Sequence, residues 1–313
     1  MSENTPVSSS ASVASAAAPA SLGLGLGMAL AVLGALAFSG KAIVVKLAYR
    51  HGADAVTLLM YRMLLALPFF AVMAWWAGRG RPALQGRDWL GVLGLGVSGY
   101  YLSSLLDFLG LQYISASLER LILYLTPTLV MALAWALRGQ RPTRRHWLAV
   151  AVSYSGALLV FGREMQLPHT AGTALGAALV LAGTASYAAY LFFSGEFVRR
   201  LGAMRLVGLA TVVACLCCIG HFLITRPLAA AAVPAPVLWL SVLNATLCTA
   251  VPVLLQMMAV ERLGASLAAQ IGLIGPLATI GMGVLILDEP FTPWLAAGTA
   301  LVLAGIGLFS RAR

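Results

Sequence analysis

The sequence predicts an all-α polytopic membrane protein with ten transmembrane helices. Of its 313 residues, 61% are hydrophobic and only 10% are charged, with a mean hydropathy of +0.92. A soluble chain of this length needs more charged residues to cover its surface. Several apolar stretches reach about 20 residues, which is enough for a helix to cross a hydrocarbon core of roughly 30 Å. These stretches do not alternate polar and apolar residues, as the strands of a membrane barrel do.

Short connectors containing Arg, Gly or Pro separate the apolar stretches, as between residues 78 and 82 or 138 and 142. Such residues end helices and form turns. We therefore expect helices over the ranges 23–49, 54–77, 88–111, 115–137, 145–162, 172–198, 204–225, 235–259, 265–287 and 293–310. Residues 1–22 are rich in Ser and Ala and lack the basic region of a signal peptide, so we interpret them as a disordered cytoplasmic tail.

The distribution of arginine predicts the orientation in the membrane. With a cytoplasmic N-terminus, thirteen arginines fall in the inner loops and tail, and only Arg50, Arg163 and Arg226 fall in the outer loops. Basic loops are retained on the cytoplasmic side. Both termini are therefore predicted to be cytoplasmic, which fits an even number of helices.

An internal repeat with a spacing of 149 residues divides the chain into two halves, 23–162 and 163–313. Its paired members are Ala116-Ser-Leu118 with Ala265-Ser-Leu267, Pro127 with Pro276, Gln140 with Glu289, and Gly156 with Gly305. Each half holds five predicted helices, and because five is odd, the halves must have opposite orientations. Inverted repeats are typical of secondary transporters, which alternate access around a site between the repeats.

Charged residues inside the predicted helices are candidates for function, because burying a charge in a membrane is costly. They are Lys41, Lys46, Arg62, Asp107, Glu119, Arg120 and Glu196. The first six fall in the outer half of the membrane and comprise four positive and two negative charges. We hypothesise that Asp107 and Glu119 neutralise part of this set and that the rest meets an anionic group such as a substrate carboxylate. Arg62 is the strongest candidate, because it lies about 12 Å along its helix from the outer end.

Several of these charges also have a structural interpretation. Lys46 and Asp107 lie near helix ends, from which their side chains can reach the outer interface. Glu119 and Arg120 can form a structural ion pair. Lys41 and Lys46 are about 140° apart around their helix, so the two cannot face one cavity equally.

Two prolines and a set of polar or aromatic residues complete the candidate site. Pro127 and Pro276 are expected to kink their helices at equivalent positions of the repeat, which indicates a central site. The residues that can line its cavity, with ordinary packing as the alternative, are Tyr100, Tyr101, Tyr124, Tyr187, Tyr190, Gln256 and Gln270.

Other kinds of site are not expected. The Gly-rich motif at 94–99 lies inside an apolar helix with no preceding strand, so it does not predict dinucleotide binding. The basic residues are scattered among loops, which argues against nucleic acid as a partner. The four cysteines lack the paired spacing of a metal site. We therefore predict no metal and no cofactor.

In order and spacing, several short motifs resemble the drug/metabolite transporter superfamily, specifically its ten-helix EamA type. They are Lys46, Tyr61-Arg62, Gly110-Leu-Gln-Tyr-Ile-Ser-Ala-Ser117, Pro127, Ala265-Ser-Leu267, Pro276 and Leu287-Asp-Glu-Pro290. The chain departs from the family pattern at Gln140, where the family has Glu, and at the charged pair Glu119-Arg120. The resemblance implies a carrier of the bacterial inner membrane, which in several members exports amino acids or related metabolites.

The leading functional prediction is a secondary transporter that exports amino acids or related small metabolites, with membrane lipid around it. An alternative is proton-coupled efflux of lipophilic cationic drugs, which needs an exposed membrane carboxylate such as Glu119, Asp107 or Glu196. The net positive charge of the embedded set argues against it. A lipid-modifying enzyme is a distant alternative, because the four histidines lack acidic neighbours that would form a catalytic cluster. The sequence does not predict an oligomeric state.

Overall fold

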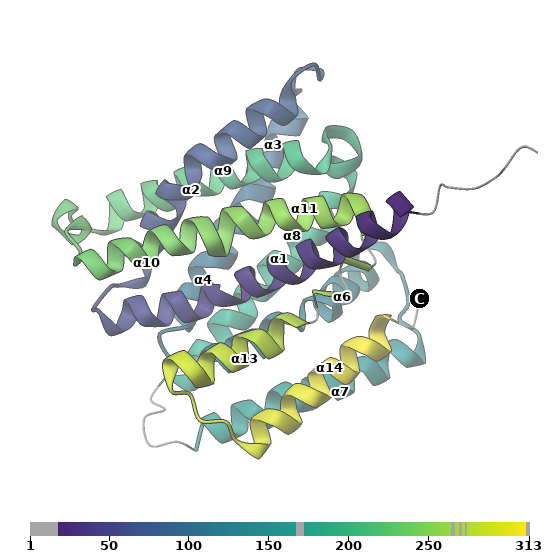
Figure 1. Ribbon diagram of the computed structural model, residues 1–313, viewed down its shortest axis with the longest axis vertical. Helices are drawn as coiled ribbons and strands as arrows, with labels where there is room; N and C mark the ends of the chain where they lie inside the picture. The colour runs from purple at the N-terminus through teal and green to yellow at the C-terminus, as the bar shows by residue number, and fades with distance from the viewer. Residues whose placement is uncertain (1–17, 167–171, 264–266, 269–270, 273, 311–313) are drawn as a thin grey trace, which may run out of the picture.

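The structure, a computed structural model, describes residues 18–166, 172–263, 267–268, 271–272 and 274–310. All regular elements within these ranges are helical (Figure 1). Gln270 and most of the predicted N-terminal tail lie outside the described residues.

The first half contains seven α-helices and one π-helical segment. They are α1 (Ala18–Arg50), α2 (Ala55–Gly78), α3 (Gly86–Gly96), the π-helical segment η1 (Val97–Leu102), α4 (Ser103–Gly110), α5 (Ala116–Leu123), α6 (Thr126–Arg138) and α7 (Arg144–Glu164). The elements of the second half follow the same order. They are α8 (Thr173–Leu201), α9 (Ala203–Thr225), the short 3₁₀ segment η2 (Leu228–Ala231), α10 (Ala235–Ala245), the π-helical segment η3 (Thr246–Ala250), α11 (Val251–Leu263), α13 (Ile274–Leu287) and α14 (Pro293–Ser310).

Seven helical stretches in the described residues are long and apolar enough to cross a membrane, with α3–α4, α5–α6 and α10–α11 each counted as one. The helices α13 and α14 are apolar but shorter, and α7 does not reach the same apolarity. The predicted polytopic helical fold is therefore confirmed. The count of ten spans stays a prediction.

The helix interruptions occur at equivalent places in the two halves. The segments η1 and η3 begin 149 residues apart, at Val97 and Thr246, which is the spacing of the sequence repeat. In the first half, the helix predicted over 115–137 is divided into α5 and α6 just before Pro127. Pro127 therefore lies in the first turn of α6, where its missing N–H costs no helical hydrogen bond, and not inside a continuous kinked helix. Pro276 likewise lies in the first turn of α13.

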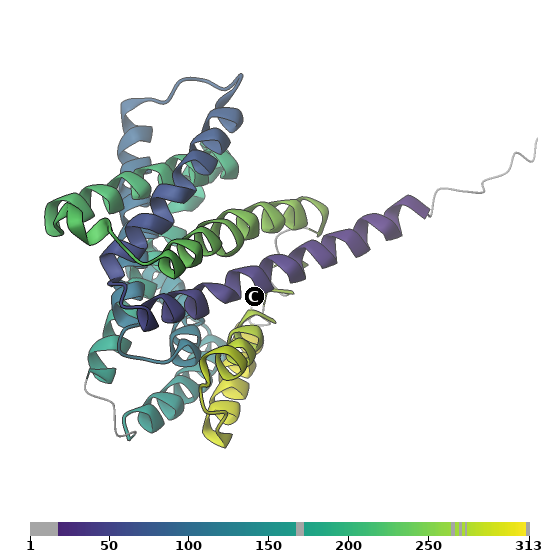
Figure 2. The same cartoon turned by 60° about the vertical axis from the view of Figure 1, so that its left-hand side comes forward.

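Helices from the two halves pack against one another throughout the bundle. In Figure 1, α7 and α14 lie side by side, and their close contact places Gly156 against the backbone carbonyl of Gly298. The helix α1 packs against α11 and α13, and α8 packs against α4, α5 and α6. Figure 2 shows the N-terminal part of α1 extending beyond the other helices.

A polar cap fixes the start of α2 at the α1–α2 loop. The Asp54 carboxylate accepts hydrogen bonds from the backbone N–H groups of Val56 and Thr57, at 3.0 and 3.2 Å, and pairs with Arg226 at 3.2 Å. Partial burial alone would raise the pKa of Asp54, but the hydrogen bonds from Thr57 and Arg226 outweigh it and lower the pKa below its usual value.

Candidate functional site: a buried charge cluster

Five charged side chains gather inside the bundle: Lys41 of α1, Arg62 of α2, Asp107 of α4, and Glu119 and Arg120 of α5. We call them the buried charge cluster. Each residue is at most 7% exposed, and Glu119 is completely buried. All five belong to the set predicted from the sequence. Such charges are tolerated inside a membrane protein when they pair with one another or face a polar cavity.

Lys41 is the centre of the cluster, because its ammonium contacts both carboxylates. Its Nζ lies 2.6 Å from Asp107 Oδ2 and 3.3 Å from Glu119 Oε1. Asp107 is therefore buried against Lys41, and the alternative that it reaches the outer interface is wrong. One cation between two anions offsets part of the cost of removing all three from water.

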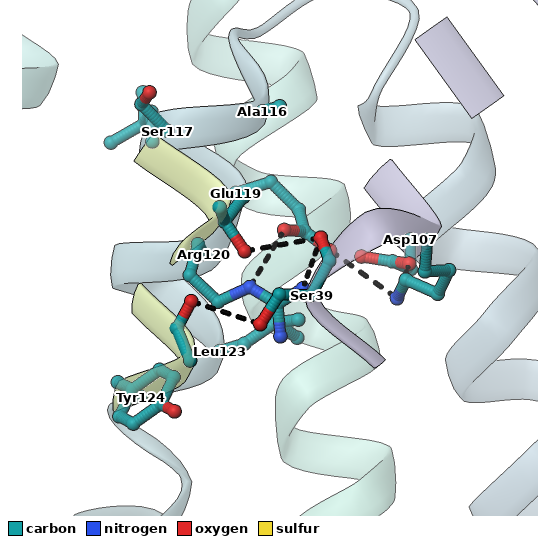
Figure 3. A network of polar contacts seen from close by, with 12 residues as sticks. Ser39, Asp107, Ala116, Ser117, Glu119, Arg120, Leu123 and Tyr124 are labelled. Carbon is teal, nitrogen blue, oxygen red and sulfur yellow. Dashed lines mark hydrogen bonds and ion pairs between the residues drawn. The ribbon is translucent and has the colours of Figure 1, made fainter. Parts of the chain in front are cut away.

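Arg120 joins the cluster to helices of both halves. Its Nε lies 3.9 Å from Glu119 Oε2, and its guanidinium donates to the Ser39 carbonyl of α1 at 3.4 Å (Figure 3). The same carbonyl accepts from the Thr279 hydroxyl of α13 at 3.2 Å. The predicted Glu119–Arg120 pair is thus present but long, and Lys41 is the nearer partner of Glu119.

Arg62 differs from the other members because no carboxylate of the described residues lies within 4.0 Å of its guanidinium. Its Nε donates to the Thr249 hydroxyl at 2.9 Å, and the guanidinium lies 5.4 Å from the ring centroid of Phe108. Thr249 belongs to η3 of the second half and donates in turn to the Asn244 carbonyl at 2.8 Å. The π-helical segment therefore supplies the polar partner of Arg62.

The cluster carries polar atoms that are buried without a hydrogen bond to any described residue. They are Arg62 Nη1, Asp107 Oδ1, both carboxylate oxygens of Glu119, and Arg120 Nε. Glu119 and Arg120 make the ion pairs described above, whereas Arg62 Nη1 and Asp107 Oδ1 form neither a hydrogen bond nor an ion pair to the described residues. Buried polar atoms without partners cost free energy, so their persistence indicates a ligand, water or functional role. With three cations and two anions, the cluster has a formal charge of +1.

Lys46 lies apart from the cluster, so the six charges predicted in the outer half of the membrane divide into two sites. Its Nζ donates to the carbonyls of Ile114 and Leu111, at 2.8 and 3.2 Å, in the connector between α4 and α5. The separation from Lys41 agrees with their predicted angle around α1. Lys46 lines a cavity of about 730 Å³, which we call the end pocket.

The end pocket lies where α1, α7 and α13 end and where α5 and α8 begin. Its lining includes the cations Lys46, Arg50 and Arg163 and the acids Glu164, Asp288 and Glu289. The two glutamates do not pair with these cations. Glu289 accepts from the N–H groups of Ala116 and Ser117 at 2.7 and 3.3 Å, and from the Ser117 hydroxyl at 2.6 Å. Glu164 accepts from the backbone and hydroxyl of Ser115.

The tyrosines predicted to line a central cavity form a separate group. Tyr187 stacks on Tyr190 with ring centroids 5.6 Å apart, and the hydroxyl groups of Tyr100 and Tyr190 lie 3.2 Å apart. Apolar side chains of α3 and α9 surround them. Tyr124 instead donates to the Gly272 carbonyl at 2.9 Å, close to α13. The described contacts connect none of the three clustered tyrosines to the buried charge cluster.

The remaining candidates take no part in the described site. Gln256 is half-buried on α11, and its side chain makes no hydrogen bond to the described residues. Glu196 is exposed on α8. Tyr101 contacts the Nδ1 atom of His221 through its hydroxyl, at 2.8 Å.

Sequence reasoning missed the neutral partners of the cluster. Ser39, Thr249 and Thr279 are single hydroxyl residues in apolar helices, where they resemble ordinary packing residues. Glu164 and Glu289 were not predicted either, because both lie at helix ends where exposed charges are common. Two signals for Glu289 were available: its pairing with Gln140 in the repeat and its place in the Leu287-Asp-Glu-Pro290 motif.

Comparison with known proteins gives relatives along most of the chain. The model of the EamA-like transporter family matches residues 25–162 and again 174–311, so that the second match begins and ends 149 residues after the first. The Uncharacterized transporter YcbK of Bacillus subtilis (strain 168) is 31% identical over 267 residues, which cover 82% of this chain and 84% of that protein. An uncharacterized transporter of Archaeoglobus fulgidus is 27% identical over 168 residues, 54% of this chain and 57% of that protein.

A solved structure titled "Crystal structure of protein" has the same fold, with a TM-score of 0.60 over 90% of this chain and 96% of that chain. Its sequence identity of 18% supports the fold alone.

The chain is thus a multi-pass helical membrane protein with charged side chains buried between its helices. Its two family matches together span most of its length. The chain belongs to the EamA-like transporter family.

Proposed function

We propose that the protein is a secondary transporter in which two inverted halves of five helices, 23–162 and 163–313, alternate access to the buried charge cluster. The equal spacing of the two family matches supports the repeat, as do the matching positions of η1 and η3. Contacts between α1 and α11 have a counterpart in those between α8 and α4. Paired interruptions in repeat-related helices are typical of a transporter binding site. We place both termini in the cytoplasm of a bacterial cell and the end pocket on the outer side of its inner membrane.

We propose that the substrate is an amino acid or a related zwitterionic metabolite and that the protein exports it. The observation that carries this proposal is the burial of Arg62 without a carboxylate partner. A substrate carboxylate fits Arg62 Nη1, because a guanidinium binds carboxylates through several N–H groups. A substrate ammonium fits Asp107 Oδ1, which is also buried without a hydrogen bond to the described residues.

The charges also favour this substrate over a lipophilic cation. Efflux of cationic drugs needs a carboxylate that is free to exchange a proton for the drug. Here Lys41 contacts the carboxylates of both Asp107 and Glu119, and the cluster has an excess of one positive charge. A bound zwitterion would leave the net charge at +1 and place its carboxylate beside the excess positive charge, whereas a bound cation would raise the net charge to +2.

The test is amino-acid release from cells loaded with dipeptides, with and without the protein. We expect faster release of particular amino acids, and we expect Arg62→Met to abolish it. Arg79→Met is the matched control, because Arg79 lies at the other end of α2, where it is exposed and stacks on Trp75 at 3.7 Å. Equal release from cells with and without the protein, over the whole amino-acid panel, would exclude amino-acid export.

A further inference from the structure

Glu289 connects the second half to the helix that carries two members of the buried charge cluster. It follows α13, and its carboxylate accepts three hydrogen bonds from Ala116 and Ser117, the first two residues of α5. Glu119 and Arg120 lie within the next four residues of α5. A carboxylate at this position satisfies N–H groups that have no partner within the helix and interacts favourably with the helix dipole. The contact therefore fixes the start of α5 from the opposite half.

The local backbone directs Glu289 toward α5. Asp288, the preceding residue, is the one non-glycine residue of the described chain with a positive φ, 59°. The N–H of Glu289 donates to the Gly283 carbonyl at 3.1 Å, so the chain turns back at the end of α13. A left-handed residue of this kind persists where surrounding contacts require it. The turn thus holds the carboxylate in place.

The end pocket and the buried charge cluster share no lining residue. Glu289 lines the end pocket, as do Ile114 and Ser115 just before α5, whereas Glu119 and Arg120 do not. Along the chain, the start of α5, where Glu289 binds, lies between Ser115 of the pocket and Glu119 of the cluster. We therefore infer that a passage between the two sites runs past this contact.

We propose that the Glu289 carboxylate keeps the end pocket closed to the buried charge cluster by holding the start of α5 in place. When this carboxylate leaves α5, a passage opens between the two sites. We call it the outer passage, and Glu289 its latch. This inference rests on the proposed alternating access and names Glu289 as the residue that controls access from the outer side. Its repeat counterpart, Gln140, is exposed, and its side chain makes no hydrogen bond to the described residues. An amide also lacks the charge that strengthens hydrogen bonds to a helix N-terminus. At this repeat position the inner side therefore has an uncharged amide where the outer side has a carboxylate.

Glu164 supplies a matched control. It also lines the end pocket and accepts hydrogen bonds just before α5, from Ser115, but it belongs to α7 of the first half. Because α5 and α7 are in the same half, a movement between the halves leaves this contact intact. Loss of the Glu164 carboxylate should therefore not open the passage, although it removes a similar set of hydrogen bonds.

The native Cys248 reports whether the passage is open. It is 4% exposed, precedes Thr249, and lies beside Gly40 next to Lys41. The experiment measures its modification by a membrane-impermeant, anionic methanethiosulfonate reagent in right-side-out vesicles, with peptide mass mapping to identify the modified cysteine. We expect Glu289→Gln to raise the rate about tenfold, the change typical for loss of a helix-capping carboxylate. We expect Glu164→Gln to leave the rate unchanged and Glu289→Asp to have a smaller effect.

An unchanged rate in Glu289→Gln, or an equal rise in Glu164→Gln, overturns the latch. If Glu289→Gln is not inserted in the membrane, a second measurement tests the latch proposal. In the variant with Ser117→Cys and Glu289→Cys, a short reagent that forms a disulfide with each of the two thiols should link them and block modification of Cys248. Reduction of these two disulfides before the modifying reagent is added should restore the modification. Unchanged modification in the linked protein also overturns the proposal. Neither measurement uses a substrate, so failure of amino-acid export in the release assay leaves this result standing.

Discussion

Replacing Arg62 with methionine should abolish transport without destabilising the protein. Methionine is apolar and flexible and can fill much of the volume of the arginine side chain. Among the described residues, Arg62 has one side-chain hydrogen bond, to Thr249, and one aromatic contact, to Phe108. Thr249 keeps its own hydrogen bond to the Asn244 carbonyl after the substitution, so its hydroxyl remains satisfied.

The expected stability change is the difference between what Arg62 contributes and what its burial costs. The hydrogen bond to a charged group contributes about 1.5–3 kcal/mol, and the cation–π contact about 0.5–2 kcal/mol. Against this, the effective cost of burying an ion in a protein is several kcal/mol, and no carboxylate of the described residues lies within 4.0 Å of the guanidinium to form an ion pair with it. The terms are of similar size, so we expect the melting temperature of Arg62→Met to equal or exceed that of the unmodified protein.

The assay pairs thermal stability with transport. Heated, detergent-solubilised protein is followed by size-exclusion chromatography, and amino-acid release is measured in cells that contain the same variant. A free-energy change of 1 kcal/mol corresponds to roughly 2–4 °C in a protein of moderate size. A fall of more than about 8 °C, equivalent to about 2–4 kcal/mol on this scale, would show that the two contacts outweigh the cost of burial and that Arg62 is structural. Normal release by a stable Arg62→Met protein would refute its role as the substrate partner.

Three further perturbations test the surrounding structure. Lys41→Met leaves two buried carboxylates without their shared cation, so it should cost about 3–5 kcal/mol and lower the melting temperature, and adding Asp107→Asn should recover part of that loss. Asp54→Ala should lower stability by about 1 kcal/mol at neutral pH through loss of the helix cap. Because the pKa of Asp54 is lowered in the folded protein, its charge stabilises above the unfolded pKa, and a pH series of melting temperatures should show that advantage disappearing as the pH falls through the folded pKa. Gly156→Val should reduce the yield of monodisperse protein, because an added Cβ would lie 2.5 Å from a carbonyl oxygen of α14, whereas Gly162→Ala, with open space around it, should express normally.

Much of the fold could be predicted from the sequence, because apolar length and arginine-rich connectors determine where a membrane helix starts and ends. The helix predicted over 54–77 is Ala55–Gly78 in the structure. The placement of the prolines was less accurate, since a proline signals a local interruption but does not say on which side of it the helix stops. The π-helical segments were not predicted, because η1 and η3 carry no residue pattern that distinguishes them from α-helix.

The candidate site could be predicted in part, because a charge in an apolar helix is visible in any sequence. That rule found all five members of the buried charge cluster. It also grouped Lys46 with them, since depth along a helix does not determine which neighbours a side chain meets. Thr249 and Glu289 could not be assigned roles in this way, because their partners, Arg62 and the start of α5, lie more than 170 residues away in the chain.

All members of the buried charge cluster belong to the first half, and this affects the energetics of the transport cycle. All five charges lie between residues 41 and 120, and the described part of the second half contributes to their hydrogen bonds only hydroxyl groups, Thr249 directly and Thr279 through the Ser39 carbonyl. A motion that keeps the first half together leaves both contacts of Lys41 with carboxylates intact and breaks only neutral or singly charged hydrogen bonds. Each such bond contributes about 0.5–3 kcal/mol net, less than the cost of breaking a buried ion pair. Both ion pairs of Lys41 can therefore persist throughout a motion of this kind.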